Sequence, residues 1–235
     1  MRKTFLAISV LLTSYQAMAQ TSANNPQFNY AEAGYVQFDI DDIDEVKPAG
    51  ITISVAKQFD QFFVAGQYMR AVDDTNQNYG ISEPGFEVDE RANMELTTTR
   101  YELGAGYIWD VSDGATIDLM VAYGNLDATA DVDFTAEIRY TDIDGNPILE
   151  TVSDSYSESA DENYFSAAAR YILNVNDFVL KGSVGAERFD TDGADTEFVY
   201  RVEAGYFVTE AASVNLGYTG GADYSVVALT ARYHF

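Results

Sequence analysis

The 235-residue sequence contains no cysteine and a single histidine, His234. Without cysteine the chain can form neither disulfides nor thiolate metal sites. Its stability must therefore come from a packed core or from a closed network of backbone hydrogen bonds. One histidine beside the carboxyl terminus also leaves little material for general acid–base catalysis, so we expect the protein not to be an enzyme.

Basic residues are scarce, with 13 Lys and Arg against 38 Asp and Glu, which gives a net charge of −25. A surface this acidic repels phosphates, so nucleic acid is excluded as a partner. Proline is rare as well, with four residues, whereas the chain has 17 Tyr, 14 Phe and 17 Gly. This composition is typical of aromatic-rich β-strands joined by tight turns.

Long apolar runs are missing after residue 19, so no transmembrane helix is expected there. The first nineteen residues have the features of a signal peptide. Arg2 and Lys3 are basic, 5–12 is apolar, and Ala17-Met18-Ala19 is a cleavage signal. We predict cleavage of residues 1–19, a periplasmic amino-terminal segment at 20–27, and one β domain over 28–235.

From residue 28 onward, apolar residues recur at every second position, which is the period of a β-strand. Leu103 and Leu119 lie in two such segments, each with one continuously apolar face and one small or polar face. The apolar face could turn inward in a soluble β-sandwich or outward to lipid in a barrel. The connections and the carboxyl terminus favour the barrel.

Ten segments have this alternation. They span residues 28–38, 50–58, 62–70, 97–108, 115–125, 164–172, 178–188, 197–207, 213–218 and 224–235. Short connections follow the second, fourth, sixth and eighth segments, whereas 39–49, 71–96 and 126–163 are long. Alternating short turns and long loops predict an all-β, up-and-down antiparallel transmembrane β-barrel of ten strands, with eight as the alternative.

The acidic residues are concentrated in the alternate connections. Residues 39–49, 71–96, 126–163, 189–196 and 219–223 contain 27 of the 38 acids and only three bases, Lys47, Arg91 and Arg139. Within 126–163, the turn sequence Asp144-Gly145-Asn146-Pro147 lies between two extended segments, which predicts that this hairpin continues beyond the membrane. We therefore expect acidic loops at one end of the barrel.

The last segment has the most specific pattern in the chain, because its apolar residues alternate up to a terminal phenylalanine. These residues are Val227, Leu229, Ala231, Tyr233 and Phe235. In this the chain resembles Gram-negative outer-membrane β-barrel proteins, whose closing strand ends in an aromatic residue that the barrel-assembly machinery recognises. The opening segment 28–36 is similar to the first strand of small porin-family barrels of the OmpX and OmpA transmembrane type. The resemblance implies the outer membrane but names no ligand.

Charged residues on the polar faces would point into the narrow interior of a ten-stranded barrel. They are Glu32, Arg100, Glu102, Asp118, Arg170, Lys181, Glu187, Arg201, Glu203 and Arg232. Because buried charges persist only when they are paired, we interpret this set, the lumen charge network, as a structural salt-bridge framework. The alternative is a narrow path for ions through the same groups.

Aromatic residues gather near the predicted strand ends. We expect Phe59, Phe62, Trp109, Tyr171, Phe178 and Phe207 on the periplasmic side, and Tyr68 and Tyr123 on the outer side, to form interfacial girdles. Which residues of segment 62–70 face inward and which face outward is left open, because the adjacent Phe62 and Phe63 break the alternation.

Metal binding has weak support. Asp190, Asp192 and Asp195 have part of the spacing of a calcium loop, but Arg201 stands at the twelfth position, where a glutamate is needed, so an ordinary polar turn is the better interpretation. No cofactor is expected beyond loosely bound Ca²⁺ or Mg²⁺ shared with lipopolysaccharide phosphates.

Together these features predict an integral outer-membrane protein, exported by its signal peptide, whose partners are outer-membrane lipid, lipopolysaccharide and, during biogenesis, the barrel-assembly machinery. Because length and charge lie in the loops, where binding residues usually lie, the expected function is surface interaction or envelope integrity through acidic extracellular loops. The alternative is a small-solute channel, weakly selective for cations because its mouth is acidic.

Overall fold

The computed structural model describes residues 26–40, 47–142, 144, 146–191, 193, 195–221 and 224–235. Within these residues ten strands follow one another: β1 Tyr30–Ile40, β2 Ala49–Phe59, β3 Phe62–Glu83, β4 Phe86–Ser112, β5 Ala115–Thr141, β6 Pro147–Val175, β7 Phe178–Phe189, β8 Thr196–Thr209, β9 Ala212–Gly220 and β10 Tyr224–His234. Among the described residues, no helix is long and apolar enough to cross a membrane. The predicted signal peptide at 1–19 lies outside them.

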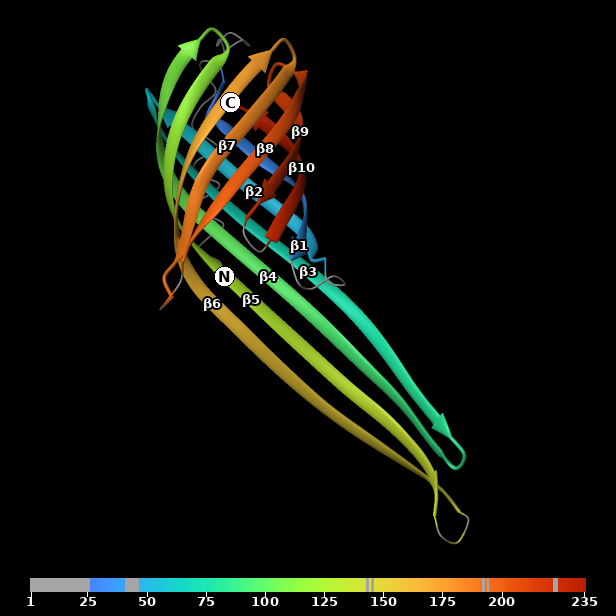
Figure 1. The fold of residues 1–235 in the computed structure, drawn as a ribbon. Helices are drawn as coiled ribbons and strands as arrows, with labels where there is room; N and C mark the ends of the chain where they lie inside the picture. The colour runs from blue at the N-terminus through green and yellow to red at the C-terminus, as the bar shows by residue number, and fades with distance from the viewer. Residues whose placement is uncertain are drawn as a thin grey trace, which may run out of the picture.

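The strands close into one barrel in which each pairs antiparallel with its neighbours in sequence, and β1 pairs with β10 (Figure 1). The closing pair runs from Tyr30 opposite His234 to Ile40 opposite Tyr224. Closure gives the backbone of every strand in the wall a partner on both sides, as a lipid environment requires. The predicted all-β, up-and-down antiparallel barrel is confirmed, with ten strands and not eight.

The barrel wall has an apolar outer face and a polar inner face. Leu103 and Leu229 are 70% and 53% exposed, whereas the inward Asp118 and Asn215 are 0% and 2% exposed. No second sheet covers the outer face in the described part of the chain, so the soluble sandwich is excluded. Large apolar side chains over a whole outer surface are favourable where that surface contacts lipid.

Most of the aromatic residues predicted for the girdles do point outward. Those with exposed side chains are Phe59, Phe62, Trp109, Tyr171 and Phe178 near one end, and Tyr68 and Tyr123 toward the other. Phe63 points inward and is 1% exposed, which settles the phase of β3. The prediction for Phe207 was wrong: it lies in phase with Arg201 and Glu203 and packs against an inward apolar cluster that includes Phe63.

Short turns occupy one end of the barrel, the turn end. Two-residue turns join β2 to β3, β4 to β5, β6 to β7 and β8 to β9, which are the four connections predicted to be short. Asp60, Gly114 and Asn176 have positive φ angles of 56°, 81° and 54°, which tight hairpin turns require and which Gly, Asn and Asp tolerate best. The carboxyl terminus lies at the same end, where the Phe235 N–H donates to the Asn29 carbonyl at 3.1 Å.

At the opposite end, β3 to β6 continue far beyond the other strands as a four-stranded sheet (Figure 1). The β2–β3 pairing stops at Ala49 opposite Val72, and β7 first meets β6 at Tyr164 opposite Phe189. We call the extension, residues 73–97 and 127–162 where described, the arm. Its ladder runs to Glu83 opposite Phe86 and to Thr141 opposite Pro147.

The arm corrects one prediction and bears out another. Residues 71–96 were expected to be a loop, but they form the paired ends of β3 and β4. Residues 73–78 are polar, so this part of β3 lacks the apolar alternation that predicts a strand. It is a strand because it pairs with β4. The predicted continuation of the 126–163 hairpin is confirmed. At its tip Asp142 Oδ1 accepts hydrogen bonds from the backbone N–H groups of Asp144 and Asn146, at 2.9 and 2.7 Å.

The closing seam leaves no space for a side chain at Gly34. A Cβ there would lie 2.2 Å from the Leu229 carbonyl oxygen and 2.6 Å from the Thr230 Cα. We expect Gly34→Ala to destabilise the barrel by about 1–3 kcal/mol, a typical cost of overpacking. Gly182→Ala is the control, because a Cβ there meets nothing within 4 Å. Urea unfolding of the refolded variants measures both, and equal stabilities would contradict the expectation.

Candidate functional site

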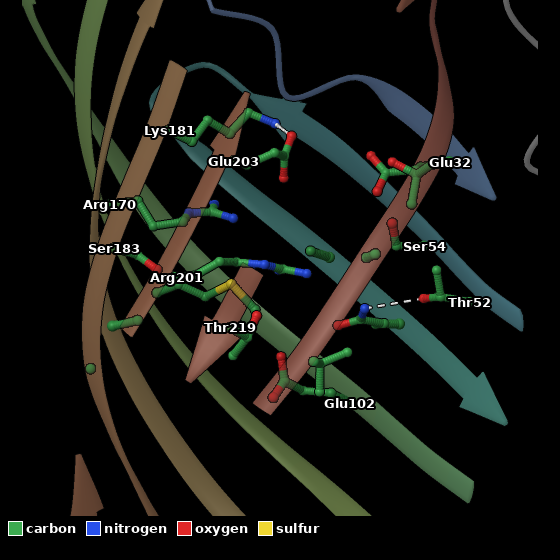
Figure 2. A pocket seen from close by; sticks show the side chains of 18 of the residues that line it. Glu32, Thr52, Ser54, Glu102, Arg170, Lys181, Ser183, Arg201, Glu203 and Thr219 are labelled. Carbon is green, nitrogen blue, oxygen red and sulfur yellow. Dashed lines mark hydrogen bonds and ion pairs between the residues drawn. The ribbon is translucent and has the colours of Figure 1, made fainter. Parts of the chain in front are cut away.

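The lumen holds the side chains of the predicted charge network. Nine of its ten members line one cavity of about 220 Å³ (Figure 2). The tenth, Asp118, points inward and is fully buried beside Arg170. Nine of the ten form ion pairs, and Arg201 is the exception among the described residues. The pairs fall into three groups, each joining two or more strands.

The first group joins β1, β7, β8 and β10. Arg232 Nη2 contacts Glu32 and also lies 3.2 Å from Glu203 Oε1. The same Glu203 oxygen accepts from Lys181 Nζ at 2.6 Å. The Arg232 guanidinium also lies 4.3 Å from the centre of the Tyr30 ring, within cation–π range. Two cations and two carboxylates therefore neutralise one another, and none of the four side chains is more than 14% exposed.

The second group crosses the lumen and is centred on Arg100. Its Nη2 donates to Glu187 Oε1 at 2.5 Å, and its Nε to the Tyr164 hydroxyl at 2.7 Å. The Tyr224 hydroxyl accepts from Nη1 at 3.3 Å and donates to Glu187 Oε2 at 3.2 Å. Glu102 lies 3.6 Å from Nη2 and accepts from the Tyr164 hydroxyl at 3.1 Å.

Tyr164 and Tyr224 were not among the predicted lumen residues, because that prediction took only the charged residues of the polar faces. The position of Tyr164 in its strand does indicate that its side chain points inward. Tyr164 lies two residues before Ser166 and six before Arg170, so it shares their inward phase on β6. Hydroxyl groups that bridge a buried arginine and a glutamate complete hydrogen bonds that the ion pair alone would leave unmade.

The third group lies nearer the turn end. Arg170 Nε donates to the two carboxylate oxygens of Asp118 at 2.9 and 3.1 Å. The guanidinium lies 5.7 and 5.3 Å from the ring centres of Phe28 and Phe63. Those rings belong to the apolar cluster of Phe28, Phe63, Ile108, Ile172 and Val179, which fills the lumen near the turns.

Arg201 differs from the other lumen cations. Its Nε is buried without a hydrogen-bond partner, and it belongs to no ion pair in the described residues. Its register partners on the flanking strands are Ser183 and Thr219. Figure 2 shows the guanidinium reaching across the open part of the cavity.

His234 and the acidic turn offer no assembled reaction centre. His234 is 8% exposed, faces the interior, and lies 5.3 Å from the Phe207 ring, with no hydrogen bond to either ring nitrogen in the described residues. Asp190 and Asp195 are exposed, and Asp192 lies outside the described residues. The described residues contain no group of three or more His, Asp or Glu arranged to hold a metal.

The closing strand presents its aromatic and aliphatic residues to the outside. Val227, Leu229, Tyr233 and Phe235 are 47%, 53%, 58% and 41% exposed, and Ala231 lies on the same outward face. This alternation continues to the last residue, so the side chains that resemble an assembly signal are all on the lipid side of β10.

The arm reverses the polarity of the barrel. Along the outward face of β5, the sequence changes from Leu119, Val121 and Tyr123 to polar residues at and beyond Asn125. The polar positions on that face are Asn125, Asp127, Thr129, Asp131, Asp133, Thr135, Glu137 and Arg139. The inward face changes the other way, from Asp118 to an apolar series.

The register assembles these series into two faces of one sheet. The face continuous with the lumen, the inner arm face, contains Leu96, Met94, Ala92, Val88 and Phe86 of β4 and Ala130, Val132, Phe134, Ala136, Ile138 and Tyr140 of β5. The opposite, outer arm face contains acids, amides and hydroxyl groups. On it Arg139 forms ion pairs with Glu87, Asp89 and Glu137 at 3.3, 3.6 and 3.0 Å. The hydrogen bond with Glu87 is the main reason that the pKa of Arg139 is raised.

No protein-family model matches the sequence, and no curated protein matches it. Solved structures do resemble the fold. The outer membrane protease OmpT from Escherichia coli has a TM-score of 0.52 at 11% identity, covering 91% of this chain and 100% of that one. The translocator domain of the autotransporter NalP from Neisseria meningitidis gives 0.43 at 13% identity, with 90% of each chain covered. Ail of Yersinia pestis gives 0.33 at 15% identity, over 88% and 97%. The likeness to OmpT shows a shared fold, the outer-membrane β-barrel.

Proposed function

We propose, for a chain that has the fold of a small Gram-negative outer-membrane β-barrel, that the barrel anchors a surface-interaction protein whose binding element is the arm. The turn end lies in the periplasm and the arm extends outside the cell. The predicted signal peptide, the aromatic residues at the two ends of the barrel wall and the outward alternation of β10 support this orientation. Lipid and lipopolysaccharide surround the wall, and the barrel-assembly machinery inserts it.

The observation that carries the proposal is the change of polarity along β3 to β6. A wall that is apolar outside suits lipid, and a sheet that is polar on that same outer face suits water. The change on β5 falls between Tyr123 and Asn125, where Asn125 Nδ2 donates to Asp161 and Asn163 of β6 at 2.5 and 3.2 Å. The sheet beyond this level is therefore built to stand in water on a rigid membrane anchor, as binding elements commonly do.

The lumen supports an anchoring role for the barrel. Ion pairs such as Arg100 to Glu187 join strands on different sides of the lumen, and the apolar cluster at the turn end fills the space beside them. We interpret the network as framework, because separating buried pairs to admit a solute would leave charges uncompensated. An enzymatic role has no support in a buried His234 with aromatic neighbours.

A narrow, weakly cation-selective channel is the second candidate, favoured by the 220 Å³ cavity that remains inside the barrel. The acids of the arm would concentrate cations at its mouth. Planar-bilayer recording separates the two candidates. Discrete conductance steps that grow with salt would support the channel, whereas a silent, folded barrel supports the anchor.

Shortening the arm tests the proposed function. Residues 75–94 are replaced by Asn-Gly, and residues 129–159 likewise, because the closing pairs Asp74–Glu95 and Ala128–Ala160 then flank two-residue hairpin turns. We expect a barrel that still shifts on a gel when boiled, together with loss of cell adhesion or serum resistance. If the shortened barrel folds, and adhesion, serum resistance and envelope permeability are all unchanged, the proposal is overturned.

A further inference from the structure

We propose that the inner arm face binds a cationic amphipathic helix along its length. This inference rests on the proposed function and names the chemistry of the partner. It follows from three features that the register brings together: an uncovered apolar stripe, acids on both sides of it, and dimensions that match a helix.

The apolar stripe runs along the two central strands. Its rows pair Leu96 with Ala130, Met94 with Val132, Ala92 with Phe134 and Val88 with Ile138, and the row of Glu90 and Ala136 lies between the last two. No element covers these side chains among the described residues, since β3 to β6 pair only edge to edge in the arm. Toward the tip, Ile81 and Phe86 are 57% and 43% exposed. In the rows themselves Val88 and Ala136 are 8% and 5% exposed, and the other apolar side chains are half-buried. An apolar surface of this extent that no other element covers marks an interaction site.

The charges on the inner arm face are all negative. Its acids are Asp73 and Glu83 of β3, Glu90 of β4, and Glu150, Asp154, Glu158 and Glu162 of β6. Both arginines of the arm, Arg91 and Arg139, lie on the outer face by the same register. Hydrogen bonds with Glu150 and Glu158 raise the pKa values of Tyr140 and Tyr156, so these tyrosines add hydroxyl groups and no charge. The stripe is thus flanked by the acids of β6 on one side and by Asp73 and Glu83 at the two ends of β3 on the other, with Glu90 inside it and no cation.

The stripe also has the length of a helix. Eleven residues of β3 beyond the barrel, 73–83, extend about 36 Å at ~3.3 Å per residue. At ~1.5 Å per residue, a helix of about 24 residues covers the same length. Four strands spaced ~4.8 Å apart are wide enough for one helix of ~10 Å diameter with room for basic side chains to reach the edge strands. Such a helix places its apolar side on the stripe and its lysines or arginines on the acids.

Other occupants fit the charges poorly. A second copy packed face to face would bring two sets of seven acids together with no cation between them. Lipid headgroups in this membrane carry phosphates, which the same carboxylates repel. A cationic partner is the one whose charge complements both sides of the stripe.

The probe is a synthetic 22-residue helical Leu/Lys peptide with a fluorescent label, titrated onto the full protein in zwitterionic nanodiscs and followed by anisotropy. The inner-face variant is Glu150→Gln with Asp154→Asn and Glu158→Gln. The matched outer-face control is Glu95→Gln with Asp131→Asn and Asp133→Asn, which removes the same charge from the same sheet. We expect the inner-face variant to weaken binding about tenfold or more, and the control less than about threefold.

Equal weakening by the two variants would mean unspecific charge attraction and would overturn the inference. So would no binding by the wild-type protein, or binding unchanged by Val132→Thr with Phe134→Gln on the stripe. Self-association through the stripe, seen as a dimer that these two substitutions dissolve, would assign the face to a second copy and also overturn it. If shortening the arm abolishes adhesion but the full protein does not bind the peptide, the proposed function stands and only this inference is overturned.

Discussion

Replacing Glu203 with methionine is expected to destabilise the barrel by about 3–5 kcal/mol, the cost of leaving a buried ion without its partner. Lys181 Nζ lies 2.6 Å from Glu203, and no other carboxylate pairs with it in the described residues. Arg232 keeps Glu32 after the substitution. The loss therefore falls mainly on the Lys181 ammonium, which stays inside the lumen unpaired. Reversible urea unfolding in lipid vesicles measures the difference.

The double variant Lys181→Met/Glu203→Met is the control. It removes both charges and fills their space with unbranched apolar side chains, and we expect its stability to lie within about 1 kcal/mol of the parent, since apolar replacement of a buried pair is often neutral. A double variant as unstable as the single one would show that the pair, and not the stranded charge, sets the stability, contrary to this account.

The second large effect is expected for Leu119→Arg on the outward face of β5. Leu119 lies opposite Tyr107 and Ala169 in the barrel wall and is 49% exposed. An arginine at the membrane midplane costs about 2–4 kcal/mol. Thr129→Arg is the control, because it lies on the same face of the same strand but in the arm, where it should change stability by no more than about 0.5 kcal/mol. Equal costs at the two positions would contradict a change from lipid to water along β5.

The barrel could be predicted from sequence because its signal repeats in every strand. Alternation at period two gives the strand, its phase gives the face, and the short turns give the order of strands. The phase also gave the lumen charges, since Glu32, Arg100 and Glu203 each alternate with outward residues. Phe207 was misplaced because it was judged by its nearness to a turn and not by its phase with Glu203.

The arm could be predicted only in part. Its β5–β6 hairpin was expected from Asp144-Gly145, but β3 beyond residue 72 begins with a polar run, and its strand state comes from pairing with β4. The inner arm face is visible in the sequence once the register is known, because Phe86, Val88, Met94 and Leu96 alternate with Glu87, Asp89 and Glu95. Sequence alone could not show that this face joins Phe134 of another hairpin, since that contact depends on register across strands far apart in the chain.

The central claim is that an outer-membrane barrel holds the arm outside the cell, and cysteine labelling on intact cells tests it most directly, because the chain has no cysteine of its own. Asp133→Cys in the arm should react with a membrane-impermeant maleimide on intact cells, Asp113→Cys at the turn end only after permeabilisation, and Leu119→Cys in neither case. Labelling of Leu119→Cys as fast as Asp133→Cys, or of Asp113→Cys on intact cells, would contradict the membrane position or the orientation of the barrel.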